Sequence, residues 1–388
     1  MSEAQLITTA AELEQVAARL LQADAVAVDT EFFWERTFYP ILGLVQLATS
    51  DGACWLVDTV RIKDLRALGP VIASPSITKV LHDAPQDLGI LARATGASPR
   101  QIFDTRLAAG FAGFGATCSL QALLREALNI ELSKAETRSD WLRRPLSANQ
   151  LRYAADDVLH LIPLREKLLA RCTSEVVREW LREDLVRLDD PAAYQDRDPR
   201  LMYLRVKGLS RLNARQLAVL RELAAWREVE ARQRDWPRGH FLQDGVLVAL
   251  ALAVPADRSA LAGVPDMPGS MPDSVLADLL AAAARGLSVP DEECPPPSPD
   301  DFSSRRKLKS KSDRLLAHLS TACAVHQIDP SLVASRADAD TFVRQLAEGT
   351  AANHPLSQGW RRSFVVDFCP SSLEGERPRD PQLDLFGA

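Results

Sequence analysis

Short apolar runs alternate with turn-forming residues between positions 25 and 58. The runs are AVAVDTEF at 25–32, GLVQLAT at 43–49 and ACWLVD at 53–58. They are rich in valine, leucine and aromatic residues, and glycine, serine and aspartate separate them, a pattern typical of β-strands. We therefore predict three consecutive strands, followed by a short fourth strand at Lys79–His82.

Apolar residues at helical spacing follow these strands. Ser119 and Ser147 stand where a side-chain oxygen caps the first turn of a helix. Strands followed by surrounding helices predict an α/β or α+β domain, which we place at residues 1–195. The helical pattern covers three stretches of this domain: Lys63–Ile72, Gln86–Ala94 and, almost without a break, Asp104–Arg171.

The second half of the chain predicts helices without strands. A loop-rich segment at 189–200 leads to a strongly amphipathic helix at Leu212–Val229, the start of an all-helical module predicted at 208–288. Five prolines in PDEECPPPSPD predict a linker at 289–300. Helical spacing resumes from Asp313 to Leu346, inside a third domain placed at 301–368, and residues 369–388 predict a flexible tail.

The composition is that of an ordinary globular protein. Of the 388 residues, 46% are hydrophobic and 25% are charged. The formal net charge is −6, so a polyanionic partner has to be met by local basic patches or by metal ions. The six cysteines are far apart and form no CxxC pair, which argues against a disulfide framework or a zinc site and favours reduced thiols.

The sequence predicts neither export nor membrane insertion. The N-terminal MSEAQLITTAAEL lacks the basic start and apolar core of a signal peptide. The longest apolar run, Val246–Val254, is far shorter than the ~18 residues that suggest a membrane span. We therefore expect a cytoplasmic protein with no membrane contact. We also expect a monomer.

Two carboxylates follow a buried strand. Because side chains two apart on a strand point to one face, Asp29 and Glu31 lie side by side. Two adjacent carboxylates near a core repel each other and lose hydration, and a divalent cation removes both penalties. A strand that merely ends in a solvated turn would carry the same residues, so this pair alone does not establish a metal site.

Two later segments also offer acids. In LHDAPQDLGIL, Asp83 and Asp87 are both candidates, although an acid in the first turn of a helix is commonly a dipole or capping residue. In LRYAADDVLHLIPL, Tyr153 and Asp157 are four apart and share a helical face, and Asp156 nearly shares it. Spacing alone does not choose between Asp156 and Asp157.

The order of these motifs resembles the DEDD exonucleases that carry a tyrosine in the third motif. The segments VDTEFFWERTFYPILGLVQLA, HDAPQDLGIL, DTRLAA and KAETRSDWLRRPLSANQLRYAADDVLHLIPL resemble the ribonuclease D branch over roughly residues 1–190. The resemblance implies a ribonuclease H-like mixed-sheet α/β domain followed by two all-helical domains. It also implies the site: Asp29, Glu31, Asp87 and Asp157 as metal ligands, and Tyr153 as the residue that orients the attacking water.

The same resemblance implies a 3′→5′ exoribonuclease that releases 5′-mononucleotides and takes precursor tRNA and other small RNAs as substrates. Phosphodiester hydrolysis needs a hydroxide, an in-line attack and relief of charge on the leaving oxygen, which two metal ions supply together. Hard oxygen ligands favour Mg²⁺ or Mn²⁺ over zinc. We expect two such ions as cofactors.

Several residues near these motifs are candidates for holding RNA. Aromatic residues after the first acidic pair stack on bases in some nucleases and pack in the core in most proteins. Basic residues beside Trp141 either grip the backbone or form a solvated loop. The candidates for substrate contact are Phe33, Gln46, His82, Lys134 and Arg143.

Three further segments point to partners. The stretch LNARQLAVLRELAAWREVEARQRDWPRGHFLQDGVLVALA, within 208–288, resembles an HRDC domain, which implies nucleic-acid binding, and a packing domain without contact is the alternative. The basic run RRKLKSKSDR at 305–314 is a candidate for phosphate contact. The tail segment Gln382–Phe386, QLDLF, resembles the peptide by which bacterial proteins dock on the DNA sliding clamp.

Three other functions are alternatives to an exoribonuclease. A DNA 3′→5′ exonuclease would use the same acids, because sugar choice depends on contacts to the 2′-hydroxyl that the sequence does not display. A non-catalytic nucleic-acid-binding protein is disfavoured because all four acids and the tyrosine are present. A P-loop helicase is excluded, since the chain has no Gly-Lys dipeptide.

Overall fold

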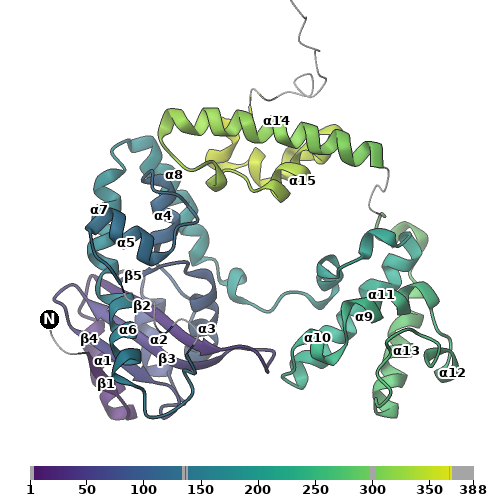
Figure 1. Cartoon of the computed structure of the whole chain (residues 1–388), viewed down its shortest axis with the longest axis horizontal. Coiled ribbons are helices and arrows are strands. Elements are labelled where there is room, and N and C mark those ends of the chain that lie inside the picture. Colours follow the sequence, from purple (N-terminus) through teal and green to yellow (C-terminus); the bar gives the residue numbers. More distant parts are fainter. Residues whose placement is uncertain (1–3, 133–135, 137–138, 298–301, 367, 369–388) are drawn as a thin grey trace, which may run out of the picture.

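The computed structural model describes residues 4–132, 136, 139–297, 302–366 and 368, and of residues 302–307 it describes the backbone. Figure 1 shows an α/β domain at the left, a group of helices at the right, and a long helix with a shorter one above the space between them. In the described part of the chain, no helix is long and apolar enough to cross a membrane.

The α/β domain is built on one mixed sheet of six strands in the order β1-β4-β3-β2-β5-β6. The central strands β2, β3 and β4 form antiparallel pairs, whereas β1, β5 and β6 are each parallel to a neighbour. The sequence predicts four of the six strands, and the two it misses are three-residue edge strands. The strands are β1 (Gln5–Ile7), β2 (Ala25–Phe33), β3 (Ile41–Thr49), β4 (Cys54–Asp58), β5 (Thr78–Leu81) and β6 (Ile102–Asp104).

Helices cover both faces of the sheet, as the apolar runs of its central strands require. One face packs Val26, Val28 and Val45 against the first group of helices, and the other packs Ala27 and Leu44 against the second. The first group is α1 (Ala10–Leu20), η1 (Arg66–Leu68), α2 (Gly69–Ala73) and α3 (Pro85–Thr95). The second is α4 (Thr105–Phe111), α5 (Leu120–Leu128), α6 (Ala148–Leu159), α7 (Leu161–Arg171) and α8 (Glu175–Val186).

Prolines explain two differences from the predicted helices. The predicted helix at 63–72 is only η1 and α2, because Pro70 has no N–H to donate and is accepted only in the first turn of a helix. The long pattern at 104–171 divides into four helices, and a proline accounts for one of the three breaks, because Pro163 stands in the first turn of the last helix, just after His160. Ser119 and Ser147 cap α5 and α6 as predicted.

The helical module at the right of Figure 1 has a core of its own. Its central helix α9 is not amphipathic as predicted, because Arg227 and Glu228 are buried there beside Trp226. Val206, two residues before the predicted start at 208, belongs to the same core. The elements are η4 (Pro199–Arg205), η5 (Leu209–Arg211), α9 (Ala214–Gln233), α10 (Arg238–Phe241), α11 (Asp244–Ala253), α12 (Arg258–Leu261) and α13 (Asp273–Leu287).

The third region is not separate from the α/β domain, since the two share one hydrophobic core. Leu315 and Leu319 of α14 (Phe302–His326) belong to the same cluster as Phe111 of α4 and Leu181 of α8. Helix α14 begins at Phe302 rather than at the predicted Asp313. Its companions are η7 (Pro330–Leu332), α15 (Arg336–Ala347), η8 (Ala351–Asn353), η9 (Pro355–Ser357) and η10 (Gly359–Phe364).

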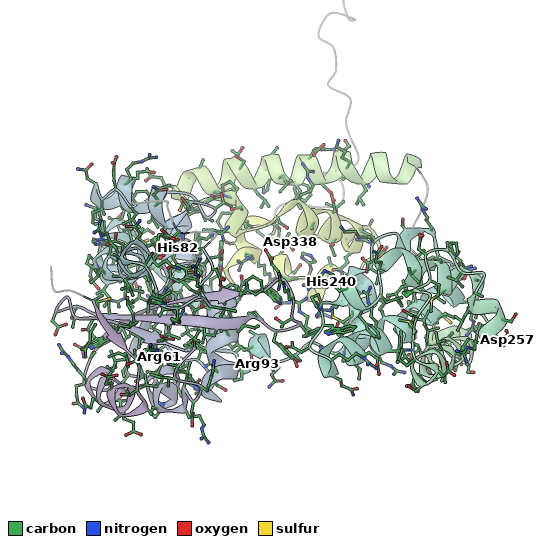
Figure 2. The ribbon with its side chains drawn as sticks, turned by 60° about the horizontal axis from the view of Figure 1, so that its bottom comes forward. Arg61, His82, Arg93, His240, Asp257 and Asp338 are labelled. Atoms are coloured by element: carbon green, nitrogen blue, oxygen red, sulfur yellow. The ribbon has the colours of Figure 1, made fainter. Side chains whose placement is uncertain are left out.

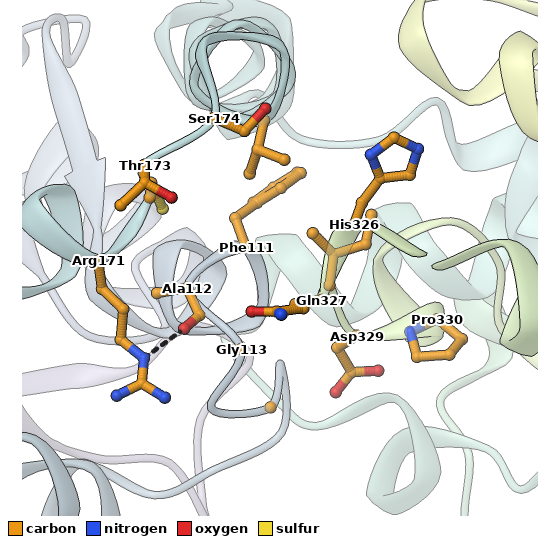
Figure 3. Close-up of a pocket in the computed structure, with 14 residues that line it drawn as sticks. Phe111, Ala112, Gly113, Arg171, Thr173, Ser174, His326, Gln327, Asp329 and Pro330 are labelled. Atoms are coloured by element: carbon orange, nitrogen blue, oxygen red, sulfur yellow. Dashed lines mark hydrogen bonds between the residues drawn. The ribbon is translucent and has the colours of Figure 1, made fainter. Parts of the chain in front are cut away.

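A buried ion pair fastens this third region to α8. The guanidinium of Arg361 donates to both carboxylate oxygens of Asp184, over 2.6 and 2.7 Å, and the indole N–H of Trp360 donates to the same carboxylate over 2.9 Å. Trp360 also stacks on Trp180 of α8 at 5.4 Å between ring centroids. A cavity of about 600 Å³ lies along the seam, where Arg171 donates to the carbonyl oxygen of Ala112 over 2.9 Å (Figure 3).

Removing the Asp184 carboxylate should loosen this seam. Asp184→Ala leaves the partly buried Arg361 guanidinium with the Leu332 carbonyl oxygen but without its charged partner, so we expect urea unfolding to show a loss of about 3 kcal/mol. Hydrogen exchange should accelerate in residues 355–364. Glu179→Ala is the matched control on α8, because its pair with Arg182 is exposed and is worth less than about 1 kcal/mol. Equal losses in both variants would contradict a clamp at Asp184.

Candidate active site

Strand β2 presents two carboxylates to helix α6. Asp29 and Glu31 alternate with Val28 and Thr30, which point to the opposite face, so the two acids share the face that α6 covers. Both are partly buried. The register of β2 against β3 shifts between Glu31 and Phe32, so the strand is irregular directly after the second acid.

Helix α6 brings a third carboxylate to this pair. One ligand oxygen from each of Asp29, Glu31 and Asp157 lies within 4.8 Å of the others. The Tyr153 hydroxyl, one helical turn earlier, forms a hydrogen bond with the Asp157 carboxylate. Asp156 is not part of this group.

Asp87, in the first turn of α3, is buried close to the three acids but is not within the 4.8 Å group. Its negative charge raises the pKa of both Asp29 and Glu31. The Thr30 hydroxyl, on the opposite face of β2, donates a hydrogen bond to the Asp87 carboxylate. Asp83 instead pairs at the surface with Arg106, so of these two acids only Asp87 acts electrostatically on Asp29 and Glu31.

Asp104 holds the start of α3 in place, a role that the sequence analysis missed. Its buried carboxylate accepts hydrogen bonds from the backbone N–H groups of Asp83 and Ala84, at 3.1 and 2.9 Å, and also caps α4 through Arg106 and Leu107. The turn that delivers Asp87 is therefore fixed to the neighbouring strand β6. The signal was present in DTRLAA, since aspartate before a helix is a common cap.

Burial raises the pKa of every carboxyl group in the site, and at Asp29 and Glu31 the charges of the other site acids raise it further. For Asp29, burial acts most strongly, followed by the charges of Asp87, Asp157 and Glu31, and its pKa lies well above the usual range. Burial, with the charges of Asp157 and Asp87, raises the pKa of Glu31 to about 9. Without a cation, these acids are expected to retain protons at neutral pH.

Hydrogen bonds partly offset the same effect at the other two acids. Burial raises the pKa of Asp157 to about 7, against the lowering effect of the hydrogen bond from Tyr153. Burial raises the pKa of Asp87 to about 6, against the lowering effect of the Thr30 hydroxyl. A set of crowded carboxylate oxygens that repel one another matches the preference of Mg²⁺ and Mn²⁺ for hard, anionic ligands.

The candidates for RNA contact differ in how far their side chains are enclosed by protein. Gln46, directly opposite Asp29 on β3, is fully buried, and its amide has no hydrogen-bond partner among the described residues. Both ring nitrogens of His82 are engaged, with the Thr105 hydroxyl at 3.0 Å and the Cys118 carbonyl at 3.2 Å. These positions weigh against direct contact of either side chain with RNA.

The remaining candidates lie nearer the surface or outside the described residues. Phe33 is partly buried, Arg143 is exposed, and Lys134 lies outside the residues that the structure describes. The neighbouring Arg144 is a structural residue, because its guanidinium pairs with both oxygens of Asp58 and donates to the Gly43 carbonyl. Of the two described basic residues after Trp141, Arg143 is thus the one exposed to a ligand.

Comparisons with known proteins find two matching family models and several curated relatives. A family model described as 3′-5′ exonuclease matches residues 4–172, and an HRDC domain model matches residues 216–282. The ribonuclease D of Desulfotalea psychrophila is 39% identical over 372 residues, which are 95% of this chain and 98% of the relative. The ribonuclease D of Pseudomonas paraeruginosa is 42% identical over 302 residues, or 77% and 78% of the two chains.

A solved structure extends the similarity to the whole architecture. Escherichia coli RNase D superposes with a TM-score of 0.81 at 29% identity, covering 96% of this chain and 98% of that one. The catalytic core of RRP6 from Trypanosoma brucei has a TM-score of 0.55 at 23% identity and covers 73% of this chain and 78% of that one, which shows a shared fold. The ribonuclease H-like mixed sheet followed by helical domains is therefore confirmed.

The effect of a bound cation on stability should depend on pH. The folded-state pKa values of Asp87, Asp157 and Glu31 lie above their unfolded values, so the stability that protonation lends is present at low pH and is lost as pH rises through about 6, 7 and 9. A cation replaces the missing protons. We expect the Tm difference between Mn²⁺-loaded and EDTA-treated protein to widen from pH 6 to 9.

Asp157→Asn is the control for this measurement. The substitution removes one titrating carboxyl group and one proposed metal ligand, so the Tm difference should widen less between pH 6 and 9. The rest of the chain contributes to the pH dependence as before. A Tm difference that stays constant over the same range would contradict competition between protons and cations at this site.

Proposed function

This chain belongs to the ribonuclease D family of 3′→5′ exoribonucleases, and from that premise we propose that it hydrolyses RNA with two divalent metal ions, Mg²⁺ or Mn²⁺. It acts in the cytoplasm on the 3′ ends of precursor tRNA and other small RNAs and releases 5′-mononucleotides. Catalysis belongs to residues 1–195, and residues 208–288 position the RNA. The similar Escherichia coli enzyme is itself described as an exoribonuclease involved in structured RNA processing.

The observation that carries this proposal is the convergence of Asp29, Glu31 and Asp157 within 4.8 Å, with Asp87 close enough to raise the pKa of two of them. When bound, two cations lower the pKa of the attacking water and stabilise the leaving 3′ oxygen. The chain supplies the anionic oxygens that hold such ions. The sheet and α6 supply them from rigid elements, so little reorganisation is required at the moment of reaction.

Tyr153 and Thr30 act on the same site through hydroxyl groups. The Tyr153 hydroxyl lies at the Asp157 carboxylate, and we assign it the orientation of the attacking water. The Thr30 hydroxyl holds one oxygen of Asp87, which leaves the other oxygen for a cation. Phe33 and Arg143 remain proposed RNA contacts. Gln46, His82 and Lys134 also remain proposed contacts, although the side chains of Gln46 and His82 face protein in the structure.

Substituting acids of the proposed site should lower the rate of RNA hydrolysis much more than substituting the acids beside it. With 5′-labelled single-stranded RNA and Mg²⁺ or Mn²⁺, the wild-type protein should give a ladder that shortens from the 3′ end, and EDTA should abolish it. Asp29→Asn and Asp157→Asn should each lower the rate by about a hundredfold to a thousandfold, since each removes a charged metal ligand. A DNA strand of the same sequence should be cut more slowly.

Asp83→Asn and Asp156→Asn are the matched controls, because each changes an acid beside the site without removing a member of it. Both should retain a rate within about threefold of wild type. A folded wild-type protein that shortens no RNA in either metal would overturn the proposal, and so would equal losses in all four variants.

Thr30→Val tests the hydroxyl that holds Asp87. The substitution keeps the shape of the side chain and removes the donor, so the Mg²⁺ concentration for half-maximal rate should rise by about tenfold. Thr30→Ser, which keeps the donor, should restore most of the affinity. A Thr30→Val protein with an unchanged metal titration would show that Asp87 needs no such support.

The predicted sliding-clamp contact through Gln382–Phe386 falls outside the described residues and stays a prediction. The side chains of Arg305, Arg306 and Lys307, which begin the basic run at 305–314, also lie outside the description. The monomeric state likewise stays a prediction. None of these three expectations is needed for the hydrolytic reaction.

A further inference from the structure

The loop that follows strand β2 is held by a residue of the HRDC module. This hairpin loop, residues 34–40, connects β2 to β3. Asp235, between α9 and α10, accepts the backbone N–H of Phe38 at its carbonyl oxygen over 3.2 Å. One oxygen of its carboxylate accepts the N–H groups of Phe38 and Tyr39, over 2.9 and 3.1 Å. A single residue of the module therefore binds two successive peptide groups of the hairpin loop.

The backbone conformation of Asp235 suits this contact. Its φ of 50° lies in the left-handed region, which disfavours most residues with a Cβ and which glycine, asparagine and aspartate adopt most readily. In this conformation the carbonyl oxygen and the carboxylate of one residue reach the same N–H group. Glycine and asparagine are therefore the substitutions that keep the backbone, and only asparagine also keeps a side-chain oxygen.

The Phe38 side chain anchors the hairpin loop in the same module. Its ring is buried, with the guanidinium groups of Arg232 and Arg238 at 5.8 and 4.5 Å from the ring centre. Both arginines pair with the carboxylate of Glu228, which is itself almost wholly buried. The hairpin loop is thus seated on packed and charge-balanced residues of α9 and α10.

The other contacts of the hairpin loop reach two of the elements that deliver acids to the site. The indole N–H of Trp34, which directly follows β2, donates to the carbonyl oxygen of Phe38 over 2.9 Å. The Tyr39 ring lies 3.7 Å from the guanidinium of Arg93, a residue of α3. The Tyr39 hydroxyl donates to Asp196 over 2.6 Å, and Asp196 also pairs with Arg93 over 2.7 Å. The hairpin loop therefore links β2 to α3.

These contacts form a continuous path from the HRDC module to the acids. The path runs from Asp235 through Tyr39 to Arg93. Figure 2 shows Arg93 on the side of the α/β domain that faces the module, where His240 lies. Helix α3 carries Asp87 in its first turn, and Asp87 is close to the other three acids without belonging to their 4.8 Å group. The placement of α3 therefore decides how near this fourth acid comes to them.

We propose that Asp235 is a positioning residue for the metal site, because its contact with the hairpin loop fixes the end of β2 and the helix α3 relative to each other. This inference rests on the proposed function, in which the four acids hold two cations. It gives the HRDC module a part in metal binding that needs no contact between the module and RNA. Because Mg²⁺ demands near-ideal geometry from its ligands, a shift of α3 weakens cation binding although no ligand is changed.

The test uses substitutions that suit a left-handed backbone. Asp235→Gly keeps the turn and removes the carboxylate, whereas Asp235→Asn keeps an oxygen that accepts the two N–H groups. Asp266→Gly is the matched control. Asp266 belongs to the same module and has a φ of 57°, and its side chain has no hydrogen bond or ion pair in the part of the chain that the structure describes. Titration calorimetry measures Mn²⁺ binding by each full-length protein without RNA, and kcat and KM for RNA are measured over a range of Mg²⁺ concentrations.

We expect Asp235→Gly to bind Mn²⁺ about fivefold more weakly than wild type and to need a correspondingly higher Mg²⁺ concentration for half-maximal hydrolysis. Asp235→Asn should restore most of the affinity, and Asp266→Gly should bind Mn²⁺ as wild type does. A module that serves only to hold RNA predicts a raised KM for RNA with unchanged Mn²⁺ affinity in Asp235→Gly, and that result would overturn the inference. Equal weakening in Asp235→Gly and Asp266→Gly would overturn it as well.

Tyr39→Phe tests the next step of the path. It removes the hydroxyl that bonds to Asp196 and keeps the ring beside Arg93, so it should weaken Mn²⁺ binding by less than Asp235→Gly does. Combined with Asp235→Gly, it should add little further loss, because both act through the same contacts. Fully additive losses would contradict a shared path. If wild-type protein binds Mn²⁺ but hydrolyses no RNA, the proposed function fails, while the calorimetry still decides whether Asp235 sets the affinity of the metal site.

Discussion

Repulsion among carboxylates in a partly buried site is the constraint that the rest of the structure has to meet. Two like charges 4 Å apart at a protein surface repel by about 4 kcal/mol, and Asp29, Glu31 and Asp157 are brought about this close. The elements that carry them are packed into the hydrophobic core. Val26 and Val28 of β2 and Ala154 and Val158 of α6 are wholly buried, so the core holds in place groups that would otherwise separate.

The surrounding residues tighten the same arrangement without entering it. Asp104 fixes the turn before α3, the Thr30 hydroxyl fixes the Asp87 carboxylate, and Arg144 ties the loop before α6 to Asp58 at the end of β4. Each of these contacts crosses from one element to another. Together they set the relative positions of the strand and the two helices that deliver the acids.

The helical regions relate to this core in different ways. The third region shares the hydrophobic cluster of the α/β domain and is fastened by the ion pair of Arg361 with Asp184, so its folding is coupled to that of the catalytic domain. The HRDC module has its own core and meets the α/β domain through the loop around Phe38. A polar contact of this kind holds a neighbouring surface near the site while leaving each domain to fold around its own interior.

The sequence alone determined the family, the carboxylates as a set and most of the elements, because strand alternation, helix caps and motif order are local properties of the chain. Ser119 and Ser147 mark helix starts, and D-x-E marks the strand that carries the acids. Tertiary structure decided what depends on contacts between distant segments. It separated Asp157 from Asp156 and Asp87 from Asp83, buried Gln46 and engaged His82, and showed that α9 is enclosed on most sides and that the third region joins the first core. Burial and partner choice are set by the whole fold, and no local spacing encodes them.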